Sequence, residues 1–314
     1  MKKAKADAAI QKAPRLPRGN VLTKHATPFL LAPYAILFIL FIIIPVVTAI
    51  ILSFTYYNTI QAPQWTGIEN YINLFTNDEV FMQYVLPNTI TYAVWVGAGG
   101  YVLAFLLAWS LSQVTKWPRT IMAIIIYSPS MTGGVLLSTV WRVIFNGDKS
   151  GYLNYILLKM NIIEEPIVWL SSSDHLLTIM VIVALWSSMG IGFLSMLSGI
   201  MNVNEELYEA AYIDGIKNRF QEIIYVTIPS AKPQMLFGAV MAIVNTFNSA
   251  GVGVSLSGAN PTPGYAGQLI VTHIDDYGFL RYEMGYAAAV SVVLLVGIYL
   301  LTQGANKVLG SRDE

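Results

Sequence analysis

The side chains best suited to binding a solute are the amides and hydroxyls that interrupt long apolar runs. In the run FGAVMAIVNTFNSAGVGVSL, Asn245, Asn248 and Ser249 recur at i, i+3 and i+4, so they would share one face of a helix. An amide inside a membrane needs a partner, so this face should contact another helix or a wet cavity. Two interpretations stay open: these side chains hold helices together, or they offer hydrogen bonds to an uncharged, hydroxyl-rich solute.

A second apolar run, near residues 176–200, offers similar groups. Trp186 could stack on a sugar ring or anchor the helix at a membrane interface, and Ser187 and Ser188 could line a solute path or only pack. Small residues also recur four apart, a spacing that permits close helix packing; the pairs are Ser188 with Gly192 and Ser195 with Gly199.

The residues that proton-coupled transport, nucleotide binding or metal binding would require are missing or lack the necessary spacing. No Asp or Glu falls inside the apolar runs, which disfavours a proton-driven carrier. The chain has no cysteine and no phosphate-cradling G-x-x-x-x-G-K-[ST] motif. Its histidines have no metal-ligand spacing, so we interpret His25, His175 and His273 as isolated surface residues. We therefore expect no enzyme activity, no cofactor bound by this chain and no metal.

Composition indicates the elements that position these side chains. Hydrophobic residues make up 55% of the chain and charged residues 11%, with a mean hydropathy of +0.57, whereas soluble domains carry about 25% charged residues. A membrane-crossing helix needs about 20 mainly apolar residues. We therefore predict an all-α membrane protein whose transmembrane domain covers 29–303, between tails at 1–28 and 304–314. Six segments qualify as spans, at about 29–52, 87–112, 120–145, 176–200, 234–256 and 285–301.

Prolines and glycines predict where these spans bend. Pro129 and the pair Gly133 and Gly134 predict a kink or hinge in the third span, and Pro45 a milder one in the first. The loop after the third span should hold a short interfacial helix near 151–160.

Lysine and arginine predict the orientation. Fourteen of the 18 lie in the first tail, in the loops after the second and fourth spans, and in the last tail. Because cytoplasmic loops carry the excess of these residues, both termini and the loop at 201–232 should be cytoplasmic.

That loop contains EELYEAAYIDGIKNRFQEIIYVTIP, a charged segment with helical periodicity. Asn204 is placed to cap a helix whose first turn holds Glu205 and Glu206, where the helix dipole favours negative charge. Gly215 should end this helix, and a second amphipathic stretch should follow at 218–226. Helix, glycine turn and helix predict a docking element on the cytoplasmic face; the alternative is a helical hairpin lying on lipid.

The segment EAAYIDG, followed by Phe220 and VTIPSAKP, resembles the EAA loop of ABC-importer permeases, in the carbohydrate-import branch that includes the maltose and glycerol-phosphate permeases. The resemblance covers nearly the whole chain, including SFTYYN, WTGIENYINLF and PIVWLSSSD. It implies the type I ABC-importer permease fold, with a cytoplasmic coupling helix pair.

The resemblance also implies partners and sites. The partners would be a second, homologous permease, two ATP-binding-cassette subunits that hold ATP and Mg, an extracytoplasmic solute-binding protein and a sugar, with no nucleic acid. The EAA loop would dock the ATPase through Glu209, Ala210, Ala211, Asp214 and Gly215. The solute path would draw on Ala184, Ser187, Ser188 and Ile191, and on Asn245, Asn248 and Ser249.

The leading interpretation is therefore the permease subunit of a carbohydrate importer in the cytoplasmic membrane, moving an oligosaccharide by alternating access. An ABC permease for a glycerol phosphodiester or a polyamine is the alternative within transport. A secondary transporter is the alternative of another class, and it would leave the EAA loop without a partner.

Overall fold

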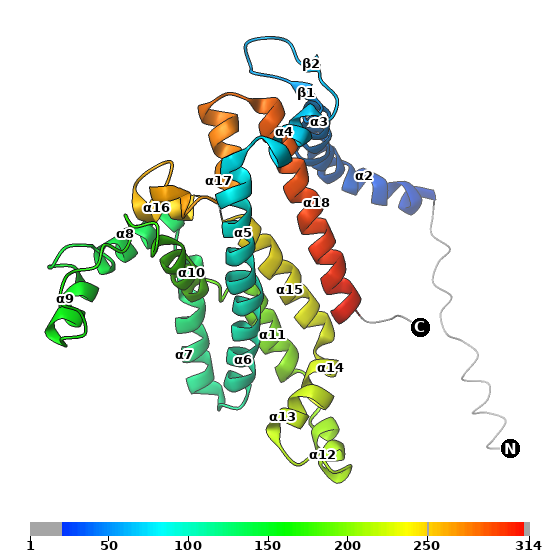
Figure 1. Ribbon diagram of the computed structural model, residues 1–314. Coiled ribbons are helices and arrows are strands. Elements are labelled where there is room, and N and C mark those ends of the chain that lie inside the picture. Colours follow the sequence, from blue (N-terminus) through cyan, green and yellow to red (C-terminus); the bar gives the residue numbers. More distant parts are fainter. Residues whose placement is uncertain (1–20, 250, 311–314) are drawn as a thin grey trace. The chain divides into compact units, whose positions relative to one another are not determined.

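The computed structural model describes residues 21–249 and 251–310; the predicted tails therefore lie partly outside the described residues. Contacts divide the chain into two units, at residues 1–51 and 52–314, and each is described by itself. Helices dominate the described residues of both units, and the described strands form one small hairpin (Figure 1).

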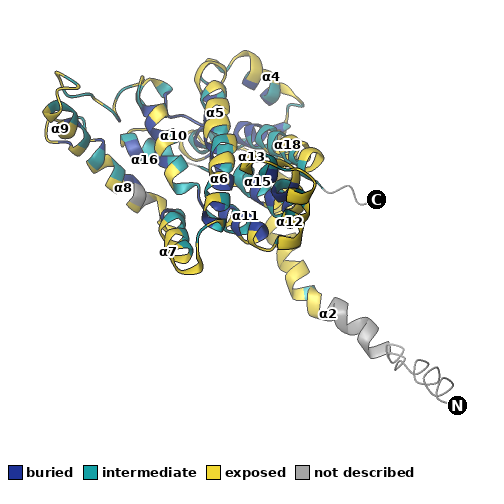
Figure 2. Ribbon diagram, turned by 90° about the horizontal axis from the view of Figure 1, so that it is seen from below, coloured by how far each residue is buried: buried dark blue, intermediate teal, exposed yellow. Residues whose placement is uncertain are grey.

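The described residues of the first unit form a helix, through α2 (Val21–Phe38), the π-helical turn η1 (Ile39–Ile43) and α3 (Ile44–Leu52). Its described part includes residues 21–28, inside the segment 1–28 that the sequence predicts to be a tail. Hydropathy marks the part of a helix that suits a bilayer, not the residue where its hydrogen bonding begins. The apolar window within Leu30–Leu52 has no buried residue, as Figure 2 shows for α2.

The second unit begins with the antiparallel hairpin of β1 (Thr55–Tyr56) and β2 (Gln64–Trp65), followed by α4 (Glu69–Thr76). A 32-residue helix then runs from Phe81 to Ser112. It is built from η2 (Phe81–Val85), α5 (Leu86–Tyr92), η3 (Ala93–Gly99) and α6 (Gly100–Ser112). It starts six residues before the predicted 87–112 because Asp78 Oδ1 accepts a hydrogen bond from the Phe81 amide at 2.8 Å and caps the first turn.

Prolines are accommodated in the long helices by wider turns. The π turns η1, η2 and η5 (Ile223–Thr227) each end two residues before a proline: Pro45, Pro87 and Pro229. In each, the residue before the proline donates its amide to the carbonyl five residues back. A proline ring clashes with the carbonyl four residues back, and the wider turn moves that carbonyl aside. Pro45 therefore leaves its helix unbroken.

Three predicted spans are interrupted. The span 120–145 consists of α7 (Lys116–Tyr127), η4 (Ser128–Met131) and α8 (Gly134–Ile144), with extended backbone at Thr132 where the sequence predicts a hinge. The span 176–200 is divided into α10 (Leu176–Ser187) and α11 (Ile191–Met201), bent by 45°. The span 234–256 is divided into α15 (Lys232–Phe247) and α16 (Val252–Ser257), with Gly251 at φ +67° between them.

The predicted six spans therefore differ in continuity. Among the described residues, three helices are long and apolar enough to cross a membrane, and α10 with α11 makes a fourth if the bent pair is one span. The three are Leu30–Leu52, Phe81–Ser112 and Met284–Leu309, the last of which is α18. A glycine or proline beside each break stops the backbone hydrogen bonding without changing the hydropathy, so an apolar count does not see it.

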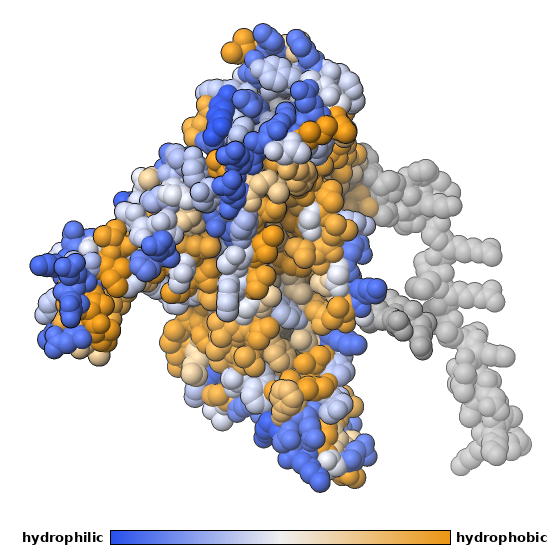
Figure 3. All heavy atoms as spheres, in the orientation of Figure 1, coloured by the Kyte–Doolittle hydropathy of each residue, from blue (hydrophilic) through white to orange (hydrophobic). Residues whose placement is uncertain are grey.

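The remaining elements lie between these helices. They are α9 (Tyr152–Lys159), α12 (Glu205–Ile213), α13 (Arg219–Glu222), α14 (Ile228–Ser230), η6 (Pro263–Tyr265), α17 (Ile270–Asp275) and η7 (Asp276–Leu280). The short helix predicted near 151–160 is confirmed as α9. In the second unit, α12 and α13 lie at one end and α17 at the opposite end (Figure 1). Figure 3 shows hydrophobic residues over the middle of this face and hydrophilic ones at both ends.

Close helix packing, predicted from small residues, is confirmed in α11. A Cβ on Gly192 would lie 3.2 Å from the Gly238 Cα of α15, and one on Gly199 would lie 2.7 Å from the Gln234 Cβ. Gly100 of α6 packs closely in the same way, because a Cβ on Gly100 would lie 3.2 Å from the Ser188 Oγ.

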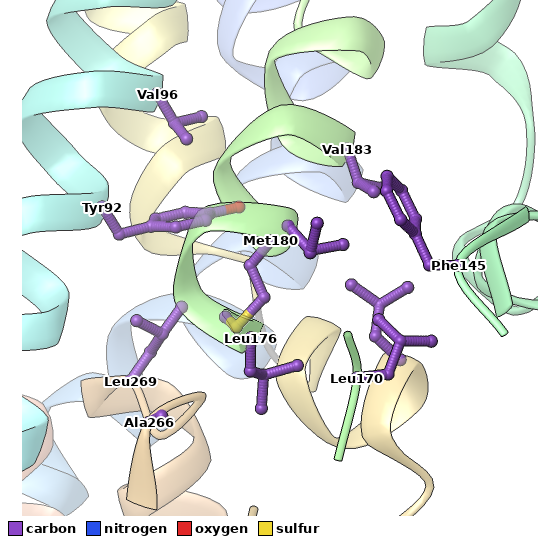
Figure 4. Packing of buried hydrophobic residues seen from close by; sticks show 11 residues of the cluster. Tyr92, Val96, Phe145, Leu170, Leu176, Met180, Val183, Ala266 and Leu269 are labelled. Carbon is purple, nitrogen blue, oxygen red and sulfur yellow. The ribbon is translucent and has the colours of Figure 1, made fainter. Parts of the chain in front are cut away.

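A buried apolar cluster fixes α10 against the 32-residue helix. Figure 4 shows Tyr92 of that helix, next to Val96, reaching toward Met180 of α10, and Val183 of α10 beside Phe145. Leu176, Phe145, Leu170, Ala266 and Leu269 complete the labelled set. This packing, with the α11–α15 contact, determines which side chains meet in the interior.

Candidate functional site

The helix pair of the charged segment forms as the sequence predicts. Asn204 Oδ1 accepts a hydrogen bond from the Glu206 amide at 3.1 Å, which confirms the cap, and α12 ends before Gly215 at φ +102°. The second helix is capped by Asn218, whose Oδ1 accepts from the Gln221 amide at 2.9 Å. Both helix starts are thus set by local side-chain bonds.

One side of α12 is fastened to the segment that follows it. The Tyr212 hydroxyl donates to Glu222 Oε2 at 2.6 Å, and Arg219 Nη1 donates to the same oxygen at 2.7 Å. Four residues earlier on α12, the hydroxyls of Tyr208 and Thr227 lie 3.2 Å apart. The Glu222 carboxylate is buried, and its hydrogen bond raises the pKa of Tyr212, with burial and the negative charge of Glu222 acting in the same direction.

The other side of α12 is open. Glu209, Ala210, Asp214 and Gly215 are exposed and Ala211 is half-buried, so the five predicted docking residues lie on or beside this side. Large apolar side chains accompany them and are also exposed, namely Leu207 at 49%, Ile213 at 86% and Phe220 at 70%. Exposed apolar groups beside a braced helix favour a surface that binds another protein.

The interior of the second unit contains a cavity of about 370 Å³. Its walls come from the 32-residue helix, α7 and η4, α10 and α11, and α15. Of the residues predicted for the solute path, this cavity is lined by Ala184, Ser187, Ser188, Ile191, Asn245 and Ser249.

Two predicted path residues lie elsewhere. Trp186 is 48% exposed and packs edge-to-face against Trp141, with ring centroids 5.4 Å apart, and it does not line the cavity. Asn248 is exposed and also outside the lining. Of the three residues predicted to share a helical face, Asn245 and Ser249 line the cavity, whereas Asn248, the residue that caps the end of α15, does not. Ser249 stays near Asn245 because its Oγ donates to the Asn245 carbonyl at 2.9 Å.

The sequence reasoning missed the contribution of the 32-residue helix. Tyr92, Val96, Gly100 and Ala104 line the cavity, together with Tyr101. The four-residue spacing and the two tyrosines in an apolar run are a usable signal. It points to the cavity only when the helix facing that side is known.

A polar cluster lies at the other end of the unit. Asp78 Oδ2 is 2.9 Å from His273 Nε2 and accepts from the Tyr286 hydroxyl at 2.7 Å. His273 is only 4% exposed, so interpreting it as a surface residue is wrong. Burial raises the pKa of Asp78, but the hydrogen bonds from His273, Tyr286 and the Phe81 amide outweigh it and hold that pKa well below its usual range. Among the described residues, no three His, Cys, Asp or Glu side chains are placed to bind a metal.

A family model confirms the resemblance seen in the sequence. Residues 98–312 match the binding-protein-dependent transport system inner membrane component family. The chain belongs to this family.

The permease has well-matched relatives. It is 31% identical over 295 residues to the arabinooligosaccharides transport system permease protein AraP of Bacillus subtilis (strain 168), covering 94% of this chain and 92% of that protein. It is 26% identical over 272 residues to the lactose transport system permease protein LacF of Rhizobium radiobacter, covering 86% and 89%.

Solved structures confirm the fold of the permease. A chain of a bacterial ABC transporter that imports the acidic polysaccharide alginate matches with a TM-score of 0.75 at 22% identity, over 94% of this chain and 99% of that one. A second structure, of an alginate transporter with a periplasmic protein bound to alginate pentasaccharide, also has a TM-score of 0.75, at 21% identity over 92% and 96%. The permease thus has the type I ABC-importer fold.

Proposed function

We propose that this permease is the membrane subunit of an oligosaccharide importer, and that a separate ATPase drives it through the α12–α13 helix pair. In this proposal the solute crosses the membrane through the cavity, and the ATPase acts on the permease through the helix pair. This chain would bind neither ATP nor Mg, both of which belong to the ATPase subunits.

The lining of the cavity supports a carbohydrate as the solute. Among the described residues, the lining has hydroxyls, aromatic rings and one amide but no Asp, Glu, Lys, Arg or His. A polyamine would favour carboxylates and a phosphodiester would favour cations in such a lining. The names of two relatives refer to arabinooligosaccharides and lactose, and one of the solved structures is of an alginate importer; all three solutes are carbohydrates.

The construction of the helix pair is the single observation that carries the coupling role. Its inner side is fastened by Tyr208, Tyr212 and Glu222, while its outer side leaves Ile213 and Phe220 bare. A surface that is rigid from behind and apolar in front can transmit a displacement, whereas a loose loop would absorb it. Closure of the ATPase dimer would move α12, and through its braces the start of α15.

We place this helix pair and both termini in the cytoplasm, on the lysine and arginine count. A second, homologous permease, two ATPase subunits and an extracytoplasmic solute-binding protein would complete the assembly. The last of these agrees with the periplasmic protein in the alginate transporter complex.

Charge reversal on the outer side of α12 tests the proposal. Glu209→Lys should abolish saccharide uptake and co-purification of the ATPase while the chain is still expressed, because it reverses the charge of an exposed docking residue. Glu165→Lys makes the same charge change at an exposed position in the loop between α9 and α10 and serves as the control. Wild-type uptake and ATPase recovery in Glu209→Lys would refute the docking assignment.

A further inference from the structure

Most hydroxyl groups in the cavity lining already have an acceptor. The side chains of the lining serines and Thr246 each donate to a carbonyl of their own helix or turn, three or four residues back. The distances are 2.7 Å for Ser130, 3.1 Å for Ser187, 2.8 Å for Ser188, 2.7 Å for Thr246 and 2.9 Å for Ser249. Because these hydroxyl protons are already donated within the chain, the hydroxyls can offer a solute mainly the lone pairs of their oxygens as acceptors.

Two tyrosines differ from this pattern. The hydroxyl oxygens of Tyr92 and Tyr101 are buried, and neither has a hydrogen-bond partner among the described residues. Tyr92 is only 1% exposed, and Figure 4 shows its ring reaching from α5 toward α10. Ser249 Oγ neighbours the Tyr92 hydroxyl, and because its own proton goes to the Asn245 carbonyl it could only accept from Tyr92, so the lone pairs of the Tyr92 oxygen stay open to a donor from the solute. A buried hydroxyl without a partner is costly, so such groups mark a place where a partner arrives.

The helix that carries these tyrosines is shaped to present Tyr92 to the cavity. Tyr92, Val96, Gly100 and Ala104 are spaced by four, and the π segment η3 lies between the first and third. An α-helix has 3.6 residues per turn, so a four-residue spacing drifts around it, and the wider π turn corrects the drift.

The lining also restricts the charge of the solute. No side chain of either charge lines the cavity among the described residues, and the lining groups that donate no hydrogen bond within the described chain are the hydroxyls of Tyr92, Tyr101 and Tyr127 and the Asn245 amide. A carboxylate moved into this lining would lose its hydration without gaining a cation. A sugar hydroxyl could accept from and donate to a tyrosine hydroxyl, while the ring covers an apolar face of the sugar.

From these observations we propose that Tyr92 and Tyr101 bind the hydroxyl groups of an uncharged oligosaccharide, and that this cavity discriminates against acidic saccharides. The inference rests on the proposed transport function and adds the residues and the charge class of the solute. It separates this permease from the alginate importers that share its fold.

Equilibrium binding to the intact transporter tests the proposal. The complex that co-purifies with a tagged copy of this chain, reconstituted in nanodiscs without the solute-binding protein, is titrated with labelled arabinotriose, lactose and an alginate trisaccharide. Tyr92→Phe and Tyr101→Phe should each weaken binding of a neutral sugar about 3- to 10-fold, and the double variant about 10- to 100-fold. Tyr299→Phe, on an exposed side chain of α18 outside the lining, should bind like wild type.

The possible results distinguish a failure of this inference from a failure of the proposed transport function. If the wild type binds and transports a neutral sugar but both phenylalanine variants bind it as Tyr299→Phe does, the tyrosine hydroxyls do not contact the sugar and the inference fails alone. Tighter binding of the alginate trisaccharide than of either neutral sugar would overturn the charge class. If the wild type transports no saccharide, even with its solute-binding protein, the proposed function fails and the inference falls with it.

Discussion

Replacing Asp78 by alanine should destabilise the permease more than any other single loss of a carboxylate outside the membrane helices. The Asp78 carboxylate accepts three hydrogen bonds, from His273 Nε2 at 2.9 Å, the Tyr286 hydroxyl at 2.7 Å and the Phe81 amide at 2.8 Å. These bonds fasten the start of the 32-residue helix to α17 and α18. The alanine variant would leave the His273 ring and the Tyr286 hydroxyl buried without their partner.

The size of the loss follows from burial. The side chains of Asp78 and His273 are 8% and 5% exposed, and removing one partner of a buried pair costs about 3–5 kcal/mol. At about 2–4 °C per kcal/mol for proteins of 150–250 residues, the melting temperature should fall by roughly 6–20 °C. Asp78→Asn keeps an acceptor for the Phe81 amide and should lose less, about 1–3 kcal/mol.

The pH dependence has a definite sign. A carboxyl group whose pKa is lowered in the folded state stabilises that state at pH values above its unfolded pKa, which is near 3.9. The Asp78 contribution should therefore be present at neutral pH and be lost only as the pH falls well below 4 toward the lowered value. The stability of Asp78→Ala should lack this acid-dependent part.

Thermal unfolding of the purified chain in detergent measures the effect. Asp148→Ala, which removes an exposed carboxylate, is the matched control and should melt like wild type. Combining Asp78→Ala with His273→Ala should cost clearly less than the sum of the two single changes, because the pair is lost only once. Equal melting temperatures for Asp78→Ala and Asp148→Ala would refute the reasoning.

Three further predictions concern packing, the solute path and the source of energy. Gly192→Val should cost about 1–3 kcal/mol and lower the yield of folded protein, because the added Cβ meets backbone atoms of α15 at 3.2 Å; Gly297→Val, with open space around it, should not, and equal yields would count against the close contact. Asn245→Leu should reduce saccharide uptake with the ATPase still bound, while Asn248→Leu, outside the cavity lining, should transport normally; a loss in Asn248→Leu alone would reverse the assignment. The purified chain alone should hydrolyse no ATP, and activity that tracks the pure chain through a final sizing column would contradict a separate energy source.

The coupling helix pair could be predicted from the sequence almost residue by residue. Asn204 caps its own helix two residues on, and Gly215 ends that helix by adopting a positive φ, so each signal acts within one turn of the chain. The fastening of α12 was not predictable in the same way. Glu222 lies ten residues after Tyr212, and only the turn at Gly215 brings the two together.

The solute cavity was predicted in part, for a similar reason. Asn245, Asn248 and Ser249 were identified together by their polarity and spacing, but only Asn245 and Ser249 line the cavity. Tyr92 and Tyr101 were missed because their neighbours in the sequence are apolar and uninformative. Their importance depends on the groups facing them across the cavity.

Taken alone, the amino-acid sequence determined the class of protein, its apolar helices, its helix caps and its family, because hydropathy, capping and motif spacing are carried by residues close together in the chain. The tertiary structure decided which predicted spans are broken and which hydroxyls of the cavity lining already donate a hydrogen bond. It also decided that His273 is a buried partner of Asp78, 195 residues away. Those properties depend on the distance between groups far apart in sequence, which local pattern does not encode.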